Sequence, residues 1–145
     1  MVTRLKLISE DIADPIFIGI VAHEPDYKLS LAINRKLGFG LKLGDSIVPE
    51  DDADLDGAIF SKYSCSLKEG EMHIDLVANC HDNRVLIKKL SNIDYIMVVH
   101  NPESDSYVDF LIEKLKEISL ISAIFLIPYD SIKDKNLRYL WPDVF

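Results

Sequence analysis

The sequence predicts an α+β domain: a mostly antiparallel sheet of about six to seven strands, with two helices packed on one face. Two apolar runs, at residues 95–99 and 120–127, bracket one amphipathic segment, as buried strands flank a helix. Three further strand-like segments follow one another closely, which is typical of an antiparallel meander. With 145 residues, 48% of them hydrophobic and 28% charged, the chain is long enough for one domain with its own core.

The N-terminal part predicts two strands and a helix. Residues 3–8 alternate apolar and basic side chains, which suits a short edge strand. Residues 15–22 are almost entirely apolar and predict the first buried strand. A helix is expected over residues 27–37, because the acidic Asp26 favours a helix N-terminus and Gly38 is a common C-terminal cap residue.

The middle of the chain predicts the meander. Its three strands are expected over residues 41–48, 58–67 and 72–79, and the last of them alternates apolar and polar side chains. The segment Lys68-Glu69-Gly70-Glu71 between the second and third reads as a short hairpin connection. Residues 81–92 are expected to be a polar connection with a short apolar island.

The C-terminal part predicts a strand, a helix and a strand. After the strand at 95–99, Ser104 and Ser106 are N-cap candidates for the helix. Its apolar residues recur at helical spacing: Val108, Leu111, Ile112, Leu115 and Ile118. The separation to the strand at 120–127 allows either a parallel crossover or a helix packed beneath antiparallel neighbours.

The whole chain, residues 1–145, is expected to be a single domain in which residues 131–145 form a docking tail. Tyr139 and Trp141 make this tail a candidate interface, since both residue types dominate binding hot spots. The tail could dock on its own subunit or on a neighbour. Because the apolar strands need cover on a second face, we also expect a symmetric homodimer, with another protein as an alternative partner.

Charge and composition exclude several classes of function. The net charge of -8 disfavours nucleic acid, because a phosphate backbone is held by clustered Lys and Arg. No apolar stretch approaches the roughly 20 residues needed to span a bilayer, so no membrane partner is expected. There is no signal-peptide pattern, and Cys65 and Cys80 lack a C-x-x-C spacing. We expect a cytoplasmic protein with reduced thiols and no cofactor.

Several short motifs resemble those of a known family. They are Leu5 and Leu7 near the start, Asp26-Tyr27-Lys28-Leu29 with Asn34 and Leu37, and Ile93-Asp94-Tyr95 before an apolar strand. Together they resemble the IPExxVDY family, small bacterial proteins found largely in Bacteroidota. Where that family has Ile-Pro-Glu, this chain has Ile87-Lys88-Lys89. The resemblance implies no particular activity and transfers no catalytic residue.

Asp52, Asp54 and Asp56, followed by Gly57, match the opening of a calcium-binding loop. The twelfth position, which should supply a bidentate Glu, is Tyr63. The flanking segments also read as strands, not helices. A solvated acidic loop without metal is therefore the favoured interpretation.

A second group of possible metal ligands lies along one strand and the segment after it. His73 and Asp75 share a strand face, and Cys80, His81 and Asp82 follow. Structural zinc sites usually show two closely spaced ligand pairs, which are absent, so an exposed polar strand face is favoured. Three serines on the preceding strand, Ser61, Ser64 and Ser66, have no histidine close in sequence and no G-x-S-x-G turn.

The ends of the two buried strands carry the remaining candidates. His23 and Asp26 follow one strand, and His100 and Glu103 follow the other. If these two strands are neighbours, the four side chains could share a polar patch that binds a small molecule or acts as an acid–base pair. No constellation outweighs its structural explanation. A non-enzymatic binding or protein-interaction module is therefore the leading prediction, and a site around His23 and His100 is the alternative.

Overall fold

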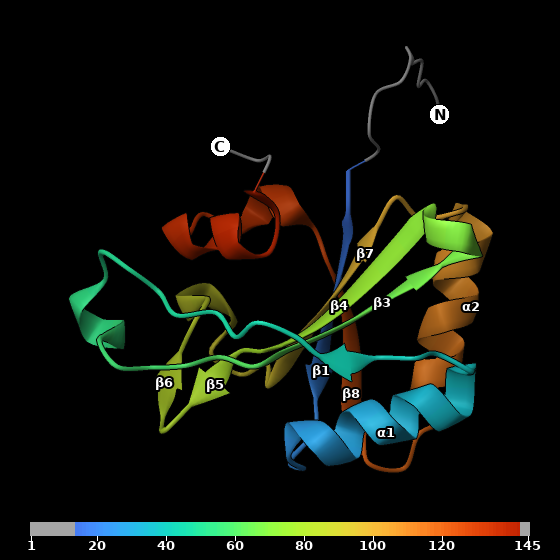
Figure 1. Ribbon diagram of the computed structural model, residues 1–145, viewed down its shortest axis with the longest axis horizontal. Coiled ribbons are helices and arrows are strands. Elements are labelled where there is room, and N and C mark those ends of the chain that lie inside the picture. The colour runs from blue at the N-terminus through green and yellow to red at the C-terminus, as the bar shows by residue number, and fades with distance from the viewer. Residues whose placement is uncertain (1–13, 143–145) are drawn as a thin grey trace.

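The computed structural model describes residues 14–142 and confirms the α+β prediction (Figure 1). A six-stranded sheet has the order β2–β3–β4–β7–β1–β8, and all its neighbouring strands are antiparallel. The strands are β1 (Ile16–Val21), β2 (Lys42–Leu43), β3 (Lys62–Leu67), β4 (Met72–Ala78), β7 (Tyr95–His100) and β8 (Ala123–Ile127). The helices are α1 (Asp26–Leu37) and α2 (Asp105–Lys116). The edge strand expected at residues 3–8 lies outside the described residues.

The connection through α2 is a crossover between parallel strands. β7 and β8 both run antiparallel to β1, which lies between them, so they are parallel to each other. By the same reasoning β1 and β4 are parallel, because both run antiparallel to β7. The segment β7–α2–β8 is therefore a split β-α-β unit with β1 between its two strands, and both helices lie on the same face.

Both helices end and begin as their cap residues predict. Gly38 adopts φ 70°, and its N–H donates to Asn34 O, so the left-handed cap closes α1. At the other helix, the Ser104 hydroxyl accepts a hydrogen bond of 3.1 Å from Tyr107 N, so Ser104 is the N-cap of α2.

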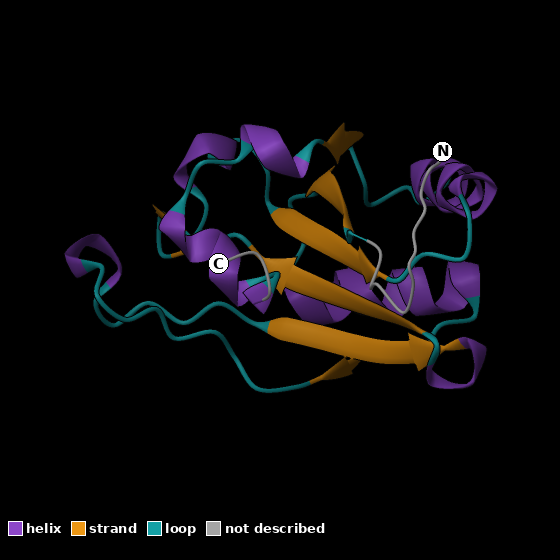
Figure 2. Cartoon of the chain, turned by 90° about the horizontal axis from the view of Figure 1, so that it is seen from above, coloured by secondary structure: helices purple, strands orange, loops and turns teal. Residues whose placement is uncertain are grey.

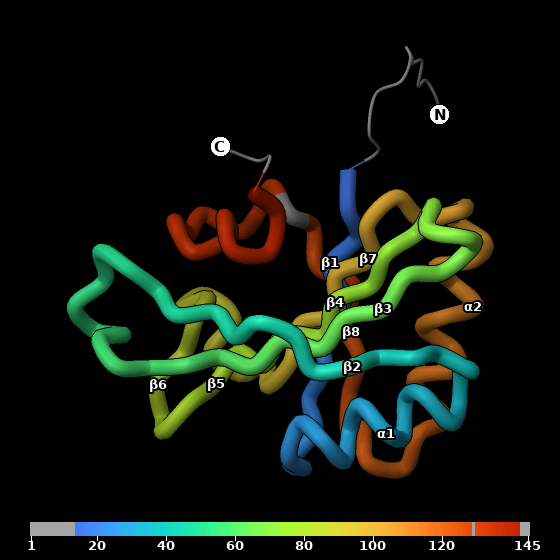
Figure 3. Tube along the Cα trace, in the orientation of Figure 1, coloured from blue at the N-terminus to red at the C-terminus, as the bar shows by residue number. Residues whose placement is uncertain are grey.

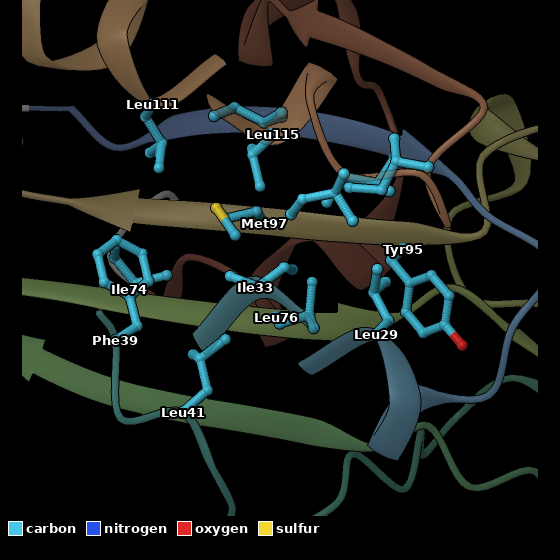
Figure 4. Close-up of a cluster of buried hydrophobic side chains, with 14 of the residues drawn as sticks. Leu29, Ile33, Phe39, Leu41, Ile74, Leu76, Tyr95, Met97, Leu111 and Leu115 are labelled. Carbon is cyan, nitrogen blue, oxygen red and sulfur yellow. The ribbon is translucent and has the colours of Figure 1, made fainter. Parts of the chain in front are cut away.

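The helix-side face of the sheet carries one hydrophobic core. Figure 4 shows Leu29 and Ile33 from α1 and Leu111 and Leu115 from α2 packed around Met97 of β7. All five side chains are completely buried. Burial of this many large aliphatic groups is what holds the two helices against the sheet.

The opposite face, here called the tail-side face, is covered by the chain's own C-terminal segment and loops (Figure 3). Leu137 and Leu140 are buried there, and the Trp141 ring lies 6.4 Å from that of Phe17. The second layer that the apolar strands require is thus present within one chain. The tail docks on its own subunit.

The loops on this face differ most from the sequence prediction. Residues 81–92 are not a simple polar connection: they contain the hairpin β5 (Cys80–His81) and β6 (Arg84–Val85), and Leu86 and Ile87 after it are fully buried. The strands expected at 41–48 and 58–67 pair only in part. The chain between β2 and β3 leaves the sheet as a long arm, seen at one end of Figure 2, because its apolar residues bury themselves on the tail-side face.

Gly19 lies in the middle of β1, where the tail-side packing leaves little room. A Cβ there would lie 2.8 Å from Ile127 Cδ1 and 3.0 Å from Ile93 Cδ1. Both atoms end flexible side chains, so we expect Gly19→Ala to lower the free energy of unfolding by about 1 kcal/mol and Gly19→Val by about 3 kcal/mol. Urea unfolding measures both. Gly40→Ala, with open space around the added Cβ, is the control, and equal stability of all three variants would contradict this packing.

Candidate functional site

Five polar side chains from three neighbouring strands meet on the tail-side face. Ser64 and Ser66 come from β3, His73 and Asp75 from β4, and His100 from β7. The register pairs Ser66 with His73 and His73 with His100, and it pairs Ser64 with Asp75. Because side chains alternate between the faces of a strand, all five project to the same side. We call this group the Ser/His/Asp cluster.

Asp75 is the centre of this cluster. Its Oδ1 accepts from the Ser64 hydroxyl at 2.6 Å and lies 2.9 Å from His73 Nε2. Its Oδ2 lies 2.9 Å from His100 Nε2. The two imidazole rings are tilted, with 5.7 Å between their centroids. One nearly buried carboxylate thus fixes the orientation of two partly exposed imidazoles.

The electrostatics keep Asp75 ionised. Burial alone would raise its pKa, but hydrogen bonds from His100 and Ser64, together with the charges of His100 and His73, lower the pKa to about 2. An ionised carboxylate is only an acceptor, so both Nε2 atoms must carry the hydrogen. In neutral imidazoles the Nδ1 atoms are then acceptors. The Ser66 hydroxyl, 3.2 Å from His73 Nδ1, donates to one of them.

A pocket of about 250 Å³ lies at the same end of the sheet, lined by residues that neighbour the cluster in sequence and by none of the cluster's five side chains. Its lining residues directly precede His73 or follow Ser66 and His100; they are Lys68, Glu71, Met72, Asn101, Pro102 and Glu103. Lys68 Nζ lies 3.4 Å from Glu103 Oε2, and Asn101 Nδ2 donates to Glu71 O at 2.6 Å. Lys68 and Asn101 have φ of 55° and 56°, a conformation uncommon for such residues. The pocket is therefore built from two tight turns.

The structure separates the two histidines that sequence analysis considered together. Register pairs Ile20 near the end of β1 with Tyr95 at the start of β7, so His23 and His100 lie at opposite ends of the sheet. Asp26 stays with His23 and accepts from Tyr27 N at 2.7 Å. The four candidates do not form one pocket. His100 belongs to the Ser/His/Asp cluster, and Glu103 lines the pocket at the same end of the sheet.

The acidic loop is occupied by the protein's own side chains. Asp52 Oδ1 accepts from Asp54 N at 3.2 Å and so caps a 3-10 turn, Ala53–Leu55. Lys88 Nζ lies 3.0 Å from Asp54 Oδ2. The backbone carbonyl of Asp56 accepts a hydrogen bond from Arg84 Nη1 at 2.6 Å. Through these contacts, the segment with Asp52, Asp54 and Asp56 holds the arm against the loops packed beside it.

The tail residues Tyr139 and Trp141 are used within the subunit. The Tyr139 hydroxyl accepts from Glu50 N at 2.9 Å and lies 3.2 Å from Arg138 Nη2. The Trp141 ring packs against Phe17. Both side chains therefore fasten the tail to its own sheet and arm.

The remaining metal-ligand candidates are dispersed. Cys80 Sγ lies 3.8 Å from Ile93 O, and His81 Nδ1 accepts from Ile59 N at 3.3 Å, so both belong to the β5–β6 hairpin and not to the cluster. Cys65 and Cys80 are free thiols. Within residues 14–142, no group of three or more His, Cys, Asp and Glu side chains is arranged to hold a metal ion.

The contact between Ser66 and His73 was not predicted, although the sequence contains a signal for it. A hairpin connection at residues 68–71 pairs Leu67 with Met72, and counting back along both strands places Ser66 opposite His73. The register that the predicted turn sets therefore implies the contact between Ser66 and His73. The addition of His100 depends on the pairing of β4 with β7, for which no short turn supplies the register.

Comparison with protein-family models, with curated proteins and with solved structures finds no match to this chain. The resemblance to the IPExxVDY family stays a prediction. In the part of the chain that the structure describes, no helix has the length and apolar character needed to cross a membrane.

Proposed function

We propose that this protein is a non-enzymatic binding module whose recognition site is the Ser/His/Asp cluster. One observation carries the proposal: Asp75, only 7% exposed, orients two imidazoles at the surface through both of its oxygens. A buried carboxylate that fixes ring orientation and tautomer is how binding groups are preorganised. The free thiols Cys65 and Cys80 suit a reducing compartment, so we propose that the module works in the cytoplasm.

The chemistry of the cluster favours a cationic ligand group. With Asp75 ionised, the cluster carries a carboxylate charge and presents acceptor atoms. The pocket at the same end of the sheet is lined by the exposed side chains of Glu71, Glu103 and Lys68, so acidic groups outnumber basic ones there. The whole chain carries a net charge of -8, which attracts positively charged partners over long range. We infer that the ligand is an arginine side chain on a basic segment of a partner protein, since guanidinium offers several donors in one plane.

Titration with a short arginine-rich peptide, followed by calorimetry, tests this proposal. We expect Asp75→Asn to weaken binding about tenfold or more, because it removes the charge and the orientation of both imidazoles. Asp45→Asn removes the same charge from an exposed loop position and is the matched control, with an expected change below about twofold. Ser66→Ala deletes one acceptor and should weaken binding without affecting the fold.

A glutamate-rich peptide of equal length is the ligand control and should not bind. If Asp75→Asn and Asp45→Asn weakened peptide binding equally, binding would depend on the net charge of the protein alone. This result would contradict the proposed site.

A second candidate function is acyl transfer, favoured by the continuous order Ser66 hydroxyl, His73 imidazole, Asp75 carboxylate. Ser66 Oγ would attack an ester carbonyl while His73 Nδ1 takes its proton and returns it to the leaving alcohol. Water would then hydrolyse the acyl-serine. Release of nitrophenolate from p-nitrophenyl acetate tests this. A rate that is unchanged in Ser66→Ala would reflect reaction at a surface imidazole and exclude Ser66 as the nucleophile.

A further inference from the structure

Within residues 14–142, one edge of the sheet is open. β8 pairs with β1 on one side, and among the described residues no strand pairs with its other side. Its outward N–H and C=O groups are therefore available for another strand. The opposite edge is formed by β2, which has only two residues, one of them Lys42. Short, charged edges of that kind resist pairing.

In the part of the chain that the structure describes, the β8 edge carries none of the usual protection. Phe125 is 46% exposed and Leu126 is 58% exposed, and residues 118–129 contain no charged side chain. An apolar pocket of about 280 Å³ continues this surface, lined by Asp14, Pro15, Ile16, Leu126, Ile127 and Pro128. An uncharged, apolar strand edge of this kind marks a surface that another strand covers.

We propose that the β8 edge is the surface through which two copies of this chain form a symmetric dimer. Each copy carries a net charge of -8, so two copies repel each other over most of their surface and approach best where charge is absent. A two-fold axis needs a surface that complements itself. β8 meets this requirement, because Phe125 is its central residue and apolar side chains occupy both of its faces.

The symmetry sets the register. Antiparallel pairing about Phe125 places it opposite Phe125 of the partner subunit, and places Ile124 opposite the partner's Leu126. The aromatic pair then lies on the tail-side face, since Phe125 pairs with Gly19 two residues from Phe17. Ile124 and Leu126 lie on the helix-side face. Cross-strand aromatic and aliphatic pairs are those that stabilise antiparallel sheets, and the two sheets join into one. This dimer does not depend on the Ser/His/Asp cluster or its ligand.

Sedimentation velocity of the full chain at micromolar concentration tests the proposal. We expect a mass twice the 16.5 kDa of one chain for the wild type, and a single-chain mass for Phe125→Glu and for Leu126→Lys. Leu43→Lys places the same charge on a 62% exposed position of the β2 edge and should remain dimeric. Circular dichroism checks that each variant is folded, which is expected because all three positions are exposed. A monomeric wild type, or a dimer that survives both β8 substitutions, would overturn the proposal.

Discussion

Leu137→Ala is expected to lower the free energy of unfolding by about 3 kcal/mol, because it opens a cavity between the tail and the sheet. Leu137 is 3% exposed and belongs to the tail-side core. The tail is also held by polar contacts, of which Lys88 N to Asp134 Oδ2, at 2.9 Å, is one. Loss of the leucine should therefore loosen the tail rather than allow it to settle elsewhere. Urea unfolding followed by tryptophan fluorescence reports the release of the tail directly, since Trp141 is the chain's one tryptophan.

Protein concentration distinguishes docking on the same subunit from docking on a neighbour. If the tail covers its own sheet, the loss caused by Leu137→Ala should be the same at low and high protein concentration. Leu43→Ala removes a leucine of equal size at an exposed position and should change stability by less than about 0.5 kcal/mol. A loss that shrinks as the protein is diluted would assign the tail to a partner subunit.

The helices and central strands could be predicted because their signals are local. Leu111 and Leu115 recur at helical spacing and both are fully buried beneath α2. The apolar run over residues 95–99 likewise corresponds to β7. These patterns depend only on which faces of an element are buried. Tertiary pairing changes their ends by a residue or two and does not change their type.

The arm could not be predicted, because its structure depends on what lies beneath it. Phe60 was expected within a strand, but its only ladder contact is an isolated bridge with Ile47. Its side chain is completely buried on the tail-side face. Leu86, which follows a hairpin of two-residue strands, is also completely buried on this face. An apolar residue in a loop does not reveal which of two sheet faces it will cover.

Only part of the candidate site could be predicted from the sequence, for a related reason. His73 and Asp75 are two residues apart, so their shared face follows from strand geometry alone. His100 joins them through the pairing of β4 with β7, whose register is set by burial along the whole of both strands. The sequence separation of 25 residues between Asp75 and His100 contains the entire β5–β6 hairpin. No local pattern specifies such a contact.

Asp75→Asn is expected to lower the free energy of unfolding by about 2 kcal/mol at neutral pH. The reason is that the folded protein holds the pKa of Asp75 at about 2, below its ordinary value of 3.8. A lowered pKa means that folding favours the ionised form. The resulting stabilisation is complete above about pH 4 and is lost as the pH falls towards 2. Asparagine cannot ionise, so the variant should lack this part of the pH dependence.

Unfolding of wild type and variant between about pH 7 and pH 2 measures the effect, and the two stability curves should converge as the pH falls. Asp45→Asn is again the matched control, because this aspartate is exposed and its substitution should leave the curve nearly unchanged. Curves for Asp75→Asn and wild type that stay parallel would mean that the two imidazoles do not stabilise the Asp75 carboxylate. The same substitution links stability to binding: a cluster that stabilises the fold and also binds the arginine-rich peptide should lose both together.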